Sequence, residues 1–405
     1  MSLTFTDIQS AADRIKDGVV RTPCLESEAL SRRLSTSVVV KYENLQHTGA
    51  FKARGALSRL LLLSDDKQRR GVVAMSAGNH SQGVAYQAGR LGIPATIVMP
   101  KGTPFVKVRK TAEYGAGVEL QGDSLEEAAT FAQTLAQEKQ LSFIHPYDDD
   151  AVIAGQGTAA LEMLEDKPDL DVLVVPVGGG GLIAGCAVAA KGLKPDIEVI
   201  GVEPELYPSL SNALNGNDRP CEGSTIGEGI AVKIAGEKSL PSIREHVKQV
   251  VTVSETSLER AVSMFLSRDK VVAEGAGAAG LAAMIEHPEM FAGKRVGLIL
   301  TGGNIDARMM SSILMRDLVR LGQVLTLSIA MPDKPGQLYA VAGICADMGA
   351  NVLEVEHTRF AMDLSASAAR LNITLETRDE AHAEQVIDRL THSGFAIQIK
   401  DPTAP

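Results

Sequence analysis

The sequence has little of the material that several protein classes need. It contains no tryptophan, only 4% aromatic residues, and four cysteines in 405 residues. Basic residues are also in the minority, with 40 Lys and Arg against 50 Asp and Glu, a formal charge of −10 and a pI near 5.4. Nucleic acids and anionic membranes both require a basic face on the protein. We therefore expect small molecules or other protein chains as partners, with no nucleic acid and no membrane.

The spacing of the cysteines excludes two further kinds of structure. They lie far apart, with no Cys-x-x-Cys pair and no nearby histidine: Cys24, Cys186, Cys221 and Cys345. This spacing suggests neither a disulfide framework nor a zinc site, and it fits a reducing cytoplasm. The N-terminus lacks the basic and apolar stretches of a signal peptide. We therefore expect a cytoplasmic protein.

One uncharged run, Val172–Ala190, is long enough to cross a membrane. It contains Pro176 and four consecutive glycines, which interrupt a helix. We therefore predict a strand, a glycine turn and a buried helix in this run.

Short runs of β-branched residues alternate with longer helix-like stretches over roughly the first three quarters of the chain. The predicted strands are Val38–Tyr42, Val72–Met75, Ala95–Met99, Val172–Pro176, Glu198–Val202, Val250–Val253 and Val296–Leu300. Their apolar runs are continuous, as expected for strands that are covered on both faces. Stretches such as Leu125–Glu138 have the apolar spacing of core-facing helices. The alternation predicts an α/β fold with an open parallel sheet.

The pattern changes near Asp317–Gln323. The residues that follow predict strand Val324–Ala330, helix Gln337–Met348, strands Asn351–Arg359 and Ala368–Glu376, helix Ala381–Gly394 and strand Ala396–Ile399. This βαββαβ order is the ferredoxin-like arrangement. We therefore predict a separate small domain at the C-terminal end.

Polar or glycine-rich residues follow several of the predicted strands, and the first such segment is Thr48–Ala56. Lys52 lies there among small and apolar residues at the start of a helix. Partial desolvation would favour its neutral amine, which is the form that makes a Schiff base. The alternative is an exposed helical lysine, which is the more common case.

The second segment, Ser76–Gly83, follows strand Val72–Met75. A strand-to-helix turn at this edge of a sheet presents backbone amides, a hydroxyl and a side-chain amide to an anion such as a carboxylate. Capping of the helix by Ser76 or Asn79 is the alternative explanation. A lone His80 carries little information.

The third segment, Gly178–Gly181 with Leu182, lies between a predicted strand and an apolar helix. Only glycine lets four consecutive amides approach a phosphate without side-chain collision, and the helix dipole adds to the attraction. The segment also fits the dinucleotide-binding fingerprint at four positions: Gly179, Gly181, Ala184 and Glu203. A nicotinamide-dependent dehydrogenase is therefore an alternative.

The fourth segment, Leu300–Asn304, places the hydroxyl of Thr301 at the end of a strand. Glu274 lies in another turn of small residues, Ala273–Gly277. A carboxylate before glycines at a helix start can simply offset the helix dipole. Each segment is ambiguous alone, but an open α/β sheet gathers such turns in one crevice.

Taken in order, these segments resemble a known family. The shared features are a lysine in Phe51-Lys52, a Ser-x-Gly-Asn-His-x-Gln-Gly run, four glycines followed by a leucine, and a Gly-Gly-Asn run. They resemble the pyridoxal-phosphate enzymes of the tryptophan-synthase-β type (fold type II), and most closely the threonine ammonia-lyases, or threonine dehydratases. The resemblance covers about residues 5 to 320, and the tail from Val324 resembles an ACT domain, an amino-acid-sensing module.

The resemblance implies a two-lobed catalytic body at 1–318, with a smaller lobe at roughly 50–148 inserted in the larger lobe, and an ACT-like regulatory domain at 324–405. Lys52 would hold pyridoxal 5′-phosphate as an imine and then act as the base at the substrate Cα. The cofactor would also lie against Phe51, Asn79, Gly178, Gly179, Gly180, Gly181, Leu182, Glu274 and Thr301. Among these, the glycine amides would bind the phosphate, Asn79 the ring hydroxyl and Thr301 the pyridine nitrogen.

The substrate carboxylate would lie among four residues of the second segment: Ser76, Ala77, Gly78 and His80. The implied reaction is β-elimination and deamination of L-threonine to 2-oxobutyrate and ammonia, with conversion of L-serine to pyruvate beside it. A neutral hydroxyl at the pyridine nitrogen suits this outcome, since it keeps the ring largely neutral and disfavours a long-lived carbanion.

Two positions depart from relatives of this family. Serine racemases carry a second serine where this chain has Ala77, so we expect weak racemisation. Some relatives bind a divalent cation near the glutamate of a Gly-Val-Glu-Pro run. That residue is Glu203 here, and the acidic partner expected six residues on is Ser209. We therefore assign no metal-binding residues, and a monovalent ion held by backbone carbonyls stays open because it leaves no sequence pattern.

The tail has two possible functions, as a dimerising ferredoxin-like domain or as an effector site for isoleucine, valine or a related amino acid. Asp333–Leu338 lies where ACT modules present backbone to an amino-acid ligand, which favours regulation. The resemblance also implies a homodimer or homotetramer. Three alternatives stay open: a serine or 3-hydroxyaspartate dehydratase or racemase of the same fold, the dehydrogenase, and a non-catalytic amino-acid-binding regulator.

Overall fold

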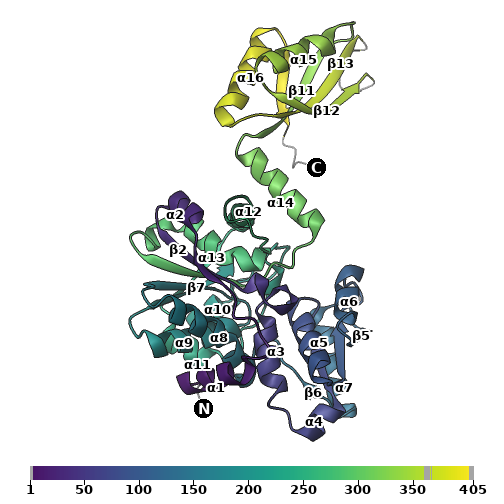
Figure 1. The fold of residues 1–405 in the computed structure, drawn as a ribbon. Helices are drawn as coiled ribbons and strands as arrows, with labels where there is room; N and C mark the ends of the chain where they lie inside the picture. The colour runs from purple at the N-terminus through teal and green to yellow at the C-terminus, as the bar shows by residue number, and fades with distance from the viewer. Residues whose placement is uncertain (1–2, 360–364, 366, 401–405) are drawn as a thin grey trace. The chain divides into compact units, whose positions relative to one another are not determined.

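The computed structural model describes residues 3–359, 365 and 367–400. The chain divides into two compact units, Met1–Ile305 and Asp306–Pro405, each with its own sheets and core (Figure 1). The division precedes helix α14 (Ala307–Arg320), whereas the predicted catalytic body extended to residue 318. Residues 401–405 of the predicted 324–405 domain lie outside the described residues. The functional limits of the two domains stay a prediction.

The larger lobe of the first unit is built on a six-stranded sheet. Its strand order is β1 (Cys24–Glu26), β2 (Ser37–Tyr42), β10 (Arg295–Leu300), β7 (Val172–Pro176), β8 (Glu198–Pro204) and β9 (Gln249–Val253). All neighbours are parallel except β1 and β2. Every residue of β7 is buried, as the continuous apolar run predicted for a strand covered on both faces.

The helices of this lobe are α1 (Phe5–Ile15), α2 (Glu28–Leu34), α8 (Asp150–Asp166), α9 (Gly181–Leu193), α10 (Ser209–Asn215), α11 (Leu240–His246), α12 (Glu255–Met264) and α13 (Gly275–Glu286). Shorter helical turns are η1 (Glu43–Leu45), η2 (His47–Gly49), η3 (Glu228–Ile230), η4 (Phe265–Asp269) and η5 (Pro288–Met290). The uncharged run 172–190 forms β7, a glycine turn and most of α9, as predicted. Within the described ranges, none of the helices combines the length and apolar character needed to span a membrane.

The smaller lobe has a four-stranded parallel sheet. Its order is β5 (Gly117–Leu120), β4 (Ala95–Met99), β3 (Val72–Met75) and β6 (Ser142–Phe143). Its helices are α3 (Lys52–Leu60), α4 (Asp65–Arg70), α5 (Asn79–Leu91), α6 (Phe105–Ala112) and α7 (Leu125–Glu138). Helix α7 begins where predicted, because the side chain of Ser124 accepts the amide of Glu127, and the helix buries its alanine-rich face.

The second unit contains an antiparallel sheet of order β12 (Asn351–Thr358), β13 (Ala368–Glu376), β11 (Val324–Pro332) and β14 (Ala396–Lys400). Helices α15 (Gln337–Asp347) and α16 (Glu380–His392) lie on one side of this sheet (Figure 1). Alternate residues of β13 are buried beneath them: Ala369, Leu371, Ile373 and Leu375. The order of elements is the predicted βαββαβ, and the unit is a small antiparallel sheet with helices.

Candidate active site

The start of helix α3 is fixed against the end of strand β10. Ala50 forms an isolated bridge with Gly302, and the amide of Phe51 donates to the carbonyl of Thr301 at 3.0 Å. Thr301 itself is buried. These contacts place Lys52, the first residue of α3, beside the fourth predicted segment.

The amine of Lys52 is packed among protein groups although the residue keeps partial exposure. Its Nζ donates to the carbonyl of Pro146 at 2.8 Å and lies 5.2 Å from the centroid of the Phe51 ring. Burial lowers the pKa of Lys52 to about 8, while the charge of Glu274 acts in the opposite direction. At neutral pH roughly one tenth of such an amine is neutral, far more than for an exposed lysine. The alternative of an ordinary exposed helical lysine is therefore wrong.

The glycine turn, Gly178–Gly181, packs against Tyr147, which follows the residue whose carbonyl accepts from Lys52. A Cβ built at Gly179 would overlap the ring of Tyr147, the residue after Pro146, and one at Gly181 would lie 2.5 Å from the Tyr147 carbonyl. Gly180 has φ +93°, which favours glycine. These glycines are therefore required by the close approach of Tyr147 and by backbone conformation, whatever ligand the turn binds.

The amides of this turn are available for a ligand. Within the described part of the chain, no hydrogen bond runs from the amides of Gly178–Leu182 to a protein acceptor. The turn begins helix α9, whose N-terminal dipole adds positive potential at the same place. Unpaired amides at a helix start suit a phosphate. The turn therefore fits the anionic group of pyridoxal phosphate.

Asn79 and Glu274 are brought together from different helices. Asn79 is the first residue of α5, and its Nδ2 donates to Oε1 of Glu274, which precedes α13, at 2.6 Å. Neither α5 nor α13 has a side-chain cap, so the interpretation of Asn79 or Ser76 as the cap of α5 is wrong. Burial raises the pKa of Glu274 to about 7, against the effect of the Asn79 hydrogen bond.

The remaining residues of the second segment line the start of α5. The Ser76 hydroxyl accepts the amide of Gly78 at 3.1 Å, and Ala77 lies between them. His80 is buried, and its Nε2 donates to the carbonyl of Ile144 at 3.0 Å, since a carbonyl only accepts. Its Nδ1 is buried without a partner among the described residues. Burial, followed by the charge of Lys52, lowers the pKa of His80 to about 3, so this histidine is neutral.

Sequence reasoning missed two residues that complete the site, Pro146 and Tyr147. They follow β6, a strand of two residues, in a segment with no motif. Pro146 contributes only a backbone carbonyl to Lys52, and Tyr147 contributes the ring against Gly179. The glycines opposite them were the one available signal of a close approach.

The carboxylate of Glu203 is occupied away from the glycine turn. It accepts the amide of Leu210 at 2.6 Å and both the amide and hydroxyl of Ser211 at 3.0 and 2.7 Å. These contacts anchor the start of helix α10. They leave the dehydrogenase interpretation without the acidic group it requires for a ribose.

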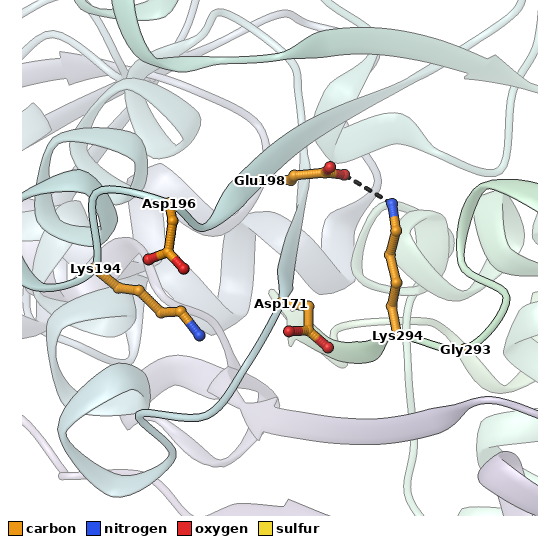
Figure 2. Close-up of a pocket in the computed structure, with 6 residues that line it drawn as sticks. All are labelled: Asp171, Lys194, Asp196, Glu198, Gly293 and Lys294. Carbon is orange, nitrogen blue, oxygen red and sulfur yellow. Dashed lines mark hydrogen bonds and ion pairs between the residues drawn. The ribbon is translucent and has the colours of Figure 1, made fainter.

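A separate charged hollow of about 370 Å³ is lined by Asp171, Lys194, Asp196, Glu198, Gly293 and Lys294 (Figure 2). These residues precede or begin strands β7, β8 and β10, so the hollow lies at the opposite edge of the sheet from the turns above. Glu198 accepts from Lys294 at 2.8 Å and from Lys248 at 2.6 Å, so its charge is already paired. The hollow is not part of the candidate site.

Comparison with known proteins agrees with this geometry. Residues 15–302 match the family described as pyridoxal-phosphate dependent enzyme. The L-threonine ammonia-lyase of Thermotoga maritima is 43% identical over 98% of this chain and 99% of its own length. The L-threo-3-hydroxyaspartate ammonia-lyase of Saccharomyces cerevisiae is 40% identical over 77% of this chain and 96% of its own length. The solved structure of threonine deaminase isoform 2 from Solanum lycopersicum, in its processed form, is 33% identical, covers 77% of this chain and 86% of that chain, and superposes with a TM-score of 0.73.

Proposed function

This chain belongs to the family of pyridoxal-phosphate dependent enzymes, and on that premise we propose that it converts L-threonine to 2-oxobutyrate and ammonia. Similarity to an L-threonine ammonia-lyase along nearly the whole chain supports the substrate. L-Serine has the same β-hydroxyl and would yield pyruvate. The observation that carries the proposal is the desolvated amine of Lys52 beside a glycine turn with unpaired amides.

The cofactor would be held by groups from both lobes. Lys52 would hold it through Nζ, with the glycine-turn amides on the phosphate, Asn79 on the ring hydroxyl and Thr301 on the ring nitrogen. Further contacts would come from Phe51, Leu182 and Glu274. Bound there, pyridoxal phosphate would supply an electron-withdrawing ring that stabilises negative charge at the substrate Cα.

Lys52 would also move the proton that starts the elimination. Its lowered pKa gives a neutral amine near physiological pH, and such an amine can accept the Cα proton of the substrate. Loss of the Cα hydrogen and the β-hydroxyl together corresponds to release of one water, and a water molecule then hydrolyses the resulting enamine to 2-oxobutyrate and ammonia. His80 is neutral and its Nε2 hydrogen is engaged by Ile144, so His80 would contribute to positioning and not to proton transfer.

The substrate carboxylate would bind at the start of α5, among Ser76, Ala77, Gly78 and His80. The helix start offers amides and positive potential. Ala77 has no hydroxyl to return a proton on the opposite face, so racemisation would be weak.

A second candidate keeps the fold and changes the substrate. The yeast relative acts, by its name, on L-threo-3-hydroxyaspartate, and it resembles the body of this chain at 40% identity. Keto-acid release from threonine, serine and 3-hydroxyaspartate separates the candidates. We expect the highest kcat/KM with threonine, and equal or better turnover of 3-hydroxyaspartate would overturn that choice. Absence of ammonia release from all three would favour the non-catalytic regulator.

We propose that the second unit is an ACT-like regulatory domain that responds to isoleucine, valine or a related amino acid. The βαββαβ order supports this, as does the turn at Asp333–Leu338, where Gly336 has φ +90° before helix α15. A coupling of about 1–3 kcal/mol between sites would suffice for control.

The regulatory proposal is tested by assaying the full chain with and without isoleucine and valine. We expect either ligand to change the rate, and Gly336→Val to remove the response because a β-branched residue is strained at that φ. Gly343→Ala, inside α15 with open space at its Cβ, is the matched control. A rate that neither amino acid alters would contradict regulation by these ligands and leave dimerisation as the role of the unit.

We further propose a cytoplasmic homodimer or homotetramer. Four free cysteines, three of them buried, suit a reducing compartment. Exposed apolar side chains on α6, Phe105 and Val106, are candidates for a subunit contact. Light scattering on the purified chain measures the assembly, and a monomeric mass would contradict the proposal.

A further inference from the structure

A chain of side-chain hydrogen bonds leads from the surface of the smaller lobe to the buried Glu274. Lys110 on α6 donates from Nζ to Oδ1 of Asn304 at 2.7 Å. Asn304 donates from Nδ2 to Oδ1 of Asn79 at 2.7 Å and to the carbonyl of Thr48 at 2.7 Å. Asn79 donates in turn from Nδ2 to Oε1 of Glu274 at 2.6 Å. Four side chains from four different segments therefore form one continuous series of hydrogen bonds, in which each side chain donates to the next.

The direction of this chain is set at Asn304, which contacts both Lys110 and the carbonyl of Thr48. A lysine ammonium donates hydrogen bonds and accepts none, so the group that Lys110 contacts on Asn304 has to be the oxygen. The NH₂ group of Asn304 then faces Asn79, and it meets the oxygen of that amide. The NH₂ group of Asn79 is thereby turned toward Glu274. The carbonyl of Thr48 only accepts and therefore favours the same orientation, so Lys110 and Thr48 together select one of two orientations for both amides.

The selected orientation matters because Asn79 has two amide hydrogens. One is donated to Glu274, and the other has no acceptor among the described residues. In the opposite orientation the amide oxygen of Asn79 would face the carboxylate of Glu274, which is unfavourable in a buried place. The second amide hydrogen of Asn79 is then a hydrogen-bond donor whose direction is fixed by the orientation of the amide.

We propose that Lys110 is a positioning residue, which acts through Asn304 to present the NH₂ group of Asn79 to the cofactor. This inference rests on the proposed function, since Asn79 is there the partner of the ring hydroxyl. No motif marks Lys110, and it lies on α6, outside every strand-end segment that the sequence singled out.

A simple tether between the lobes is the competing explanation for Lys110. Lys107 on the same helix already forms an ion pair with Glu228 at 2.6 Å, so α6 has a second tie to the larger lobe. Among the described residues, Arg109 pairs with Glu113, the residue that follows α6, at 3.4 Å, and its side chain is 63% exposed. Arg109 therefore offers the same loss of charge on the same helix without the hydrogen-bond chain.

The test compares Lys110→Met, Asn304→Asp and Arg109→Met in the full-length protein loaded with pyridoxal phosphate. The readouts are the dissociation constant of the cofactor and the position of its visible absorbance band, beside kcat and KM for threonine. We expect Lys110→Met to weaken cofactor binding roughly tenfold, the effect of one misdirected hydrogen bond. Lys110→Arg, which also only donates, should recover most of that loss, and Arg109→Met should match the unaltered protein.

Asn304→Asp separates the two explanations. An aspartate keeps an acceptor for Lys110 and so keeps the tether, but it has no hydrogen to donate to Asn79. If Lys110 acts by orienting the amides, Asn304→Asp should lose at least as much affinity for the cofactor as Lys110→Met and should shift the visible absorbance band of the cofactor. Unchanged affinity in Asn304→Asp, or equal behaviour of Lys110→Met and Arg109→Met, overturns the inference. If the unaltered protein binds no cofactor at all, the proposed function fails first, and the inference with it.

Discussion

Lys52 and Arg54, two basic residues in the first turn of helix α3, have surroundings that differ in kind. Arg54 is fully buried and donates to both oxygens of Glu43 at 2.8 Å each and to both oxygens of Glu162 at 2.7 and 2.8 Å. It also donates to Thr158 at 3.1 Å. A second buried cation, Lys41, pairs with Glu162 at 2.6 Å. Two cations and two carboxylates therefore balance one another.

The pKa values of this cluster reflect the pairing. Burial alone would lower the pKa of Arg54, but Glu43 and Glu162 raise it instead. Burial alone would raise the pKa of Glu162, but its hydrogen bonds and charge contacts with Arg54 and Lys41 bring it below its usual value. The cluster is charged and complete without any ligand.

Lys52, Glu274 and His80 show the opposite behaviour. Among the described residues, Lys52 has a carbonyl at hydrogen-bond distance, Glu274 has the Asn79 side chain and the backbone of Asn304, and His80 has an unpartnered ring nitrogen. Burial moves each of their pKa values toward the neutral form. The difference shows which buried charges are structural and which groups are left for a ligand, since perturbed and incompletely paired groups cluster at functional sites.

The largest effect should come from Lys52→Ala. It removes the proposed cofactor attachment and the proposed base, so kcat should fall by roughly 10⁴-fold or more. Because the amine has no charged partner at hydrogen-bond distance among the described residues, the free energy of unfolding of the cofactor-free protein should not decrease. Chemical denaturation beside a keto-acid assay measures both. A stable variant with substantial activity would contradict the role of Lys52.

Arg54→Met should show the reverse. Two carboxylates would lose their main partner inside the protein, which typically costs about 3–5 kcal/mol of unfolding free energy. Denaturant unfolding of the cofactor-free protein measures the loss. A loss under about 1 kcal/mol would show that the cluster is not a structural ion network. The Lys52→Ala and Arg54→Met pair thus separates activity from stability two residues apart on one helix.

Titration of the site should change the unfolding free energy of the cofactor-free protein in opposite directions over two ranges of pH, and each range is a limb of the stability curve. With its pKa raised from 4.5 to about 7, Glu274 holds a proton in the folded chain that the unfolded chain has lost, so stability falls as pH rises through that window. With its pKa lowered from 10.5 to about 8, Lys52 lacks a proton that the unfolded chain holds, so stability rises as pH rises from about 8 to 10.5.

Variants assign each limb to its group. Glu274→Gln should flatten the first limb and leave the second, and Lys52→Met should do the reverse. Thermal unfolding at a series of pH values, with each variant compared to the unaltered chain, measures the difference. Difference curves without pH dependence would contradict the assigned protonation states.

Many of the strands and site residues can be predicted from the local sequence, and the others depend on contacts between distant segments that the local sequence does not indicate. Strands β3, β4, β7 and β13 have the predicted bounds, because their residues are continuously apolar or alternate between buried and less buried positions. Strands β1, β5 and β6 were missed. They have two to four residues each and little apolar content, so their pairing is decided by the neighbouring strands.

The site shows the same division. Asn79, the glycine turn and Thr301 follow strands β3, β7 and β10, and parallel strands bring these ends to one edge of a sheet. Lys52 follows β2 after the turns η1 and η2, whereas Glu274 follows helix α12 and the turn η4. The carbonyl of Pro146 and the amine of Lys110 reach the site from segments without any pattern. Backbone carbonyls are the same in every residue, and a long lysine side chain spans distances that sequence spacing does not encode.

The smallest effect should come from Arg21→Met, the exposed counterpart of Arg54. Arg21 pairs with Glu165 at 3.0 Å and Asp166 at 2.7 Å, but its side chain is 52% exposed. Ion pairs in water contribute about 0–1 kcal/mol, so unfolding should change by no more than that. A loss comparable to that of Arg54→Met would mean that burial is not what distinguishes the two arginines.

The most direct test of the account is to locate the cofactor on the chain. The purified protein is loaded with pyridoxal phosphate, reduced with borohydride to make the attachment permanent, digested, and mapped by mass spectrometry. The account predicts a single modified peptide, with the added mass on Lys52. An unmodified Lys52, or the same mass spread over surface lysines, would contradict it.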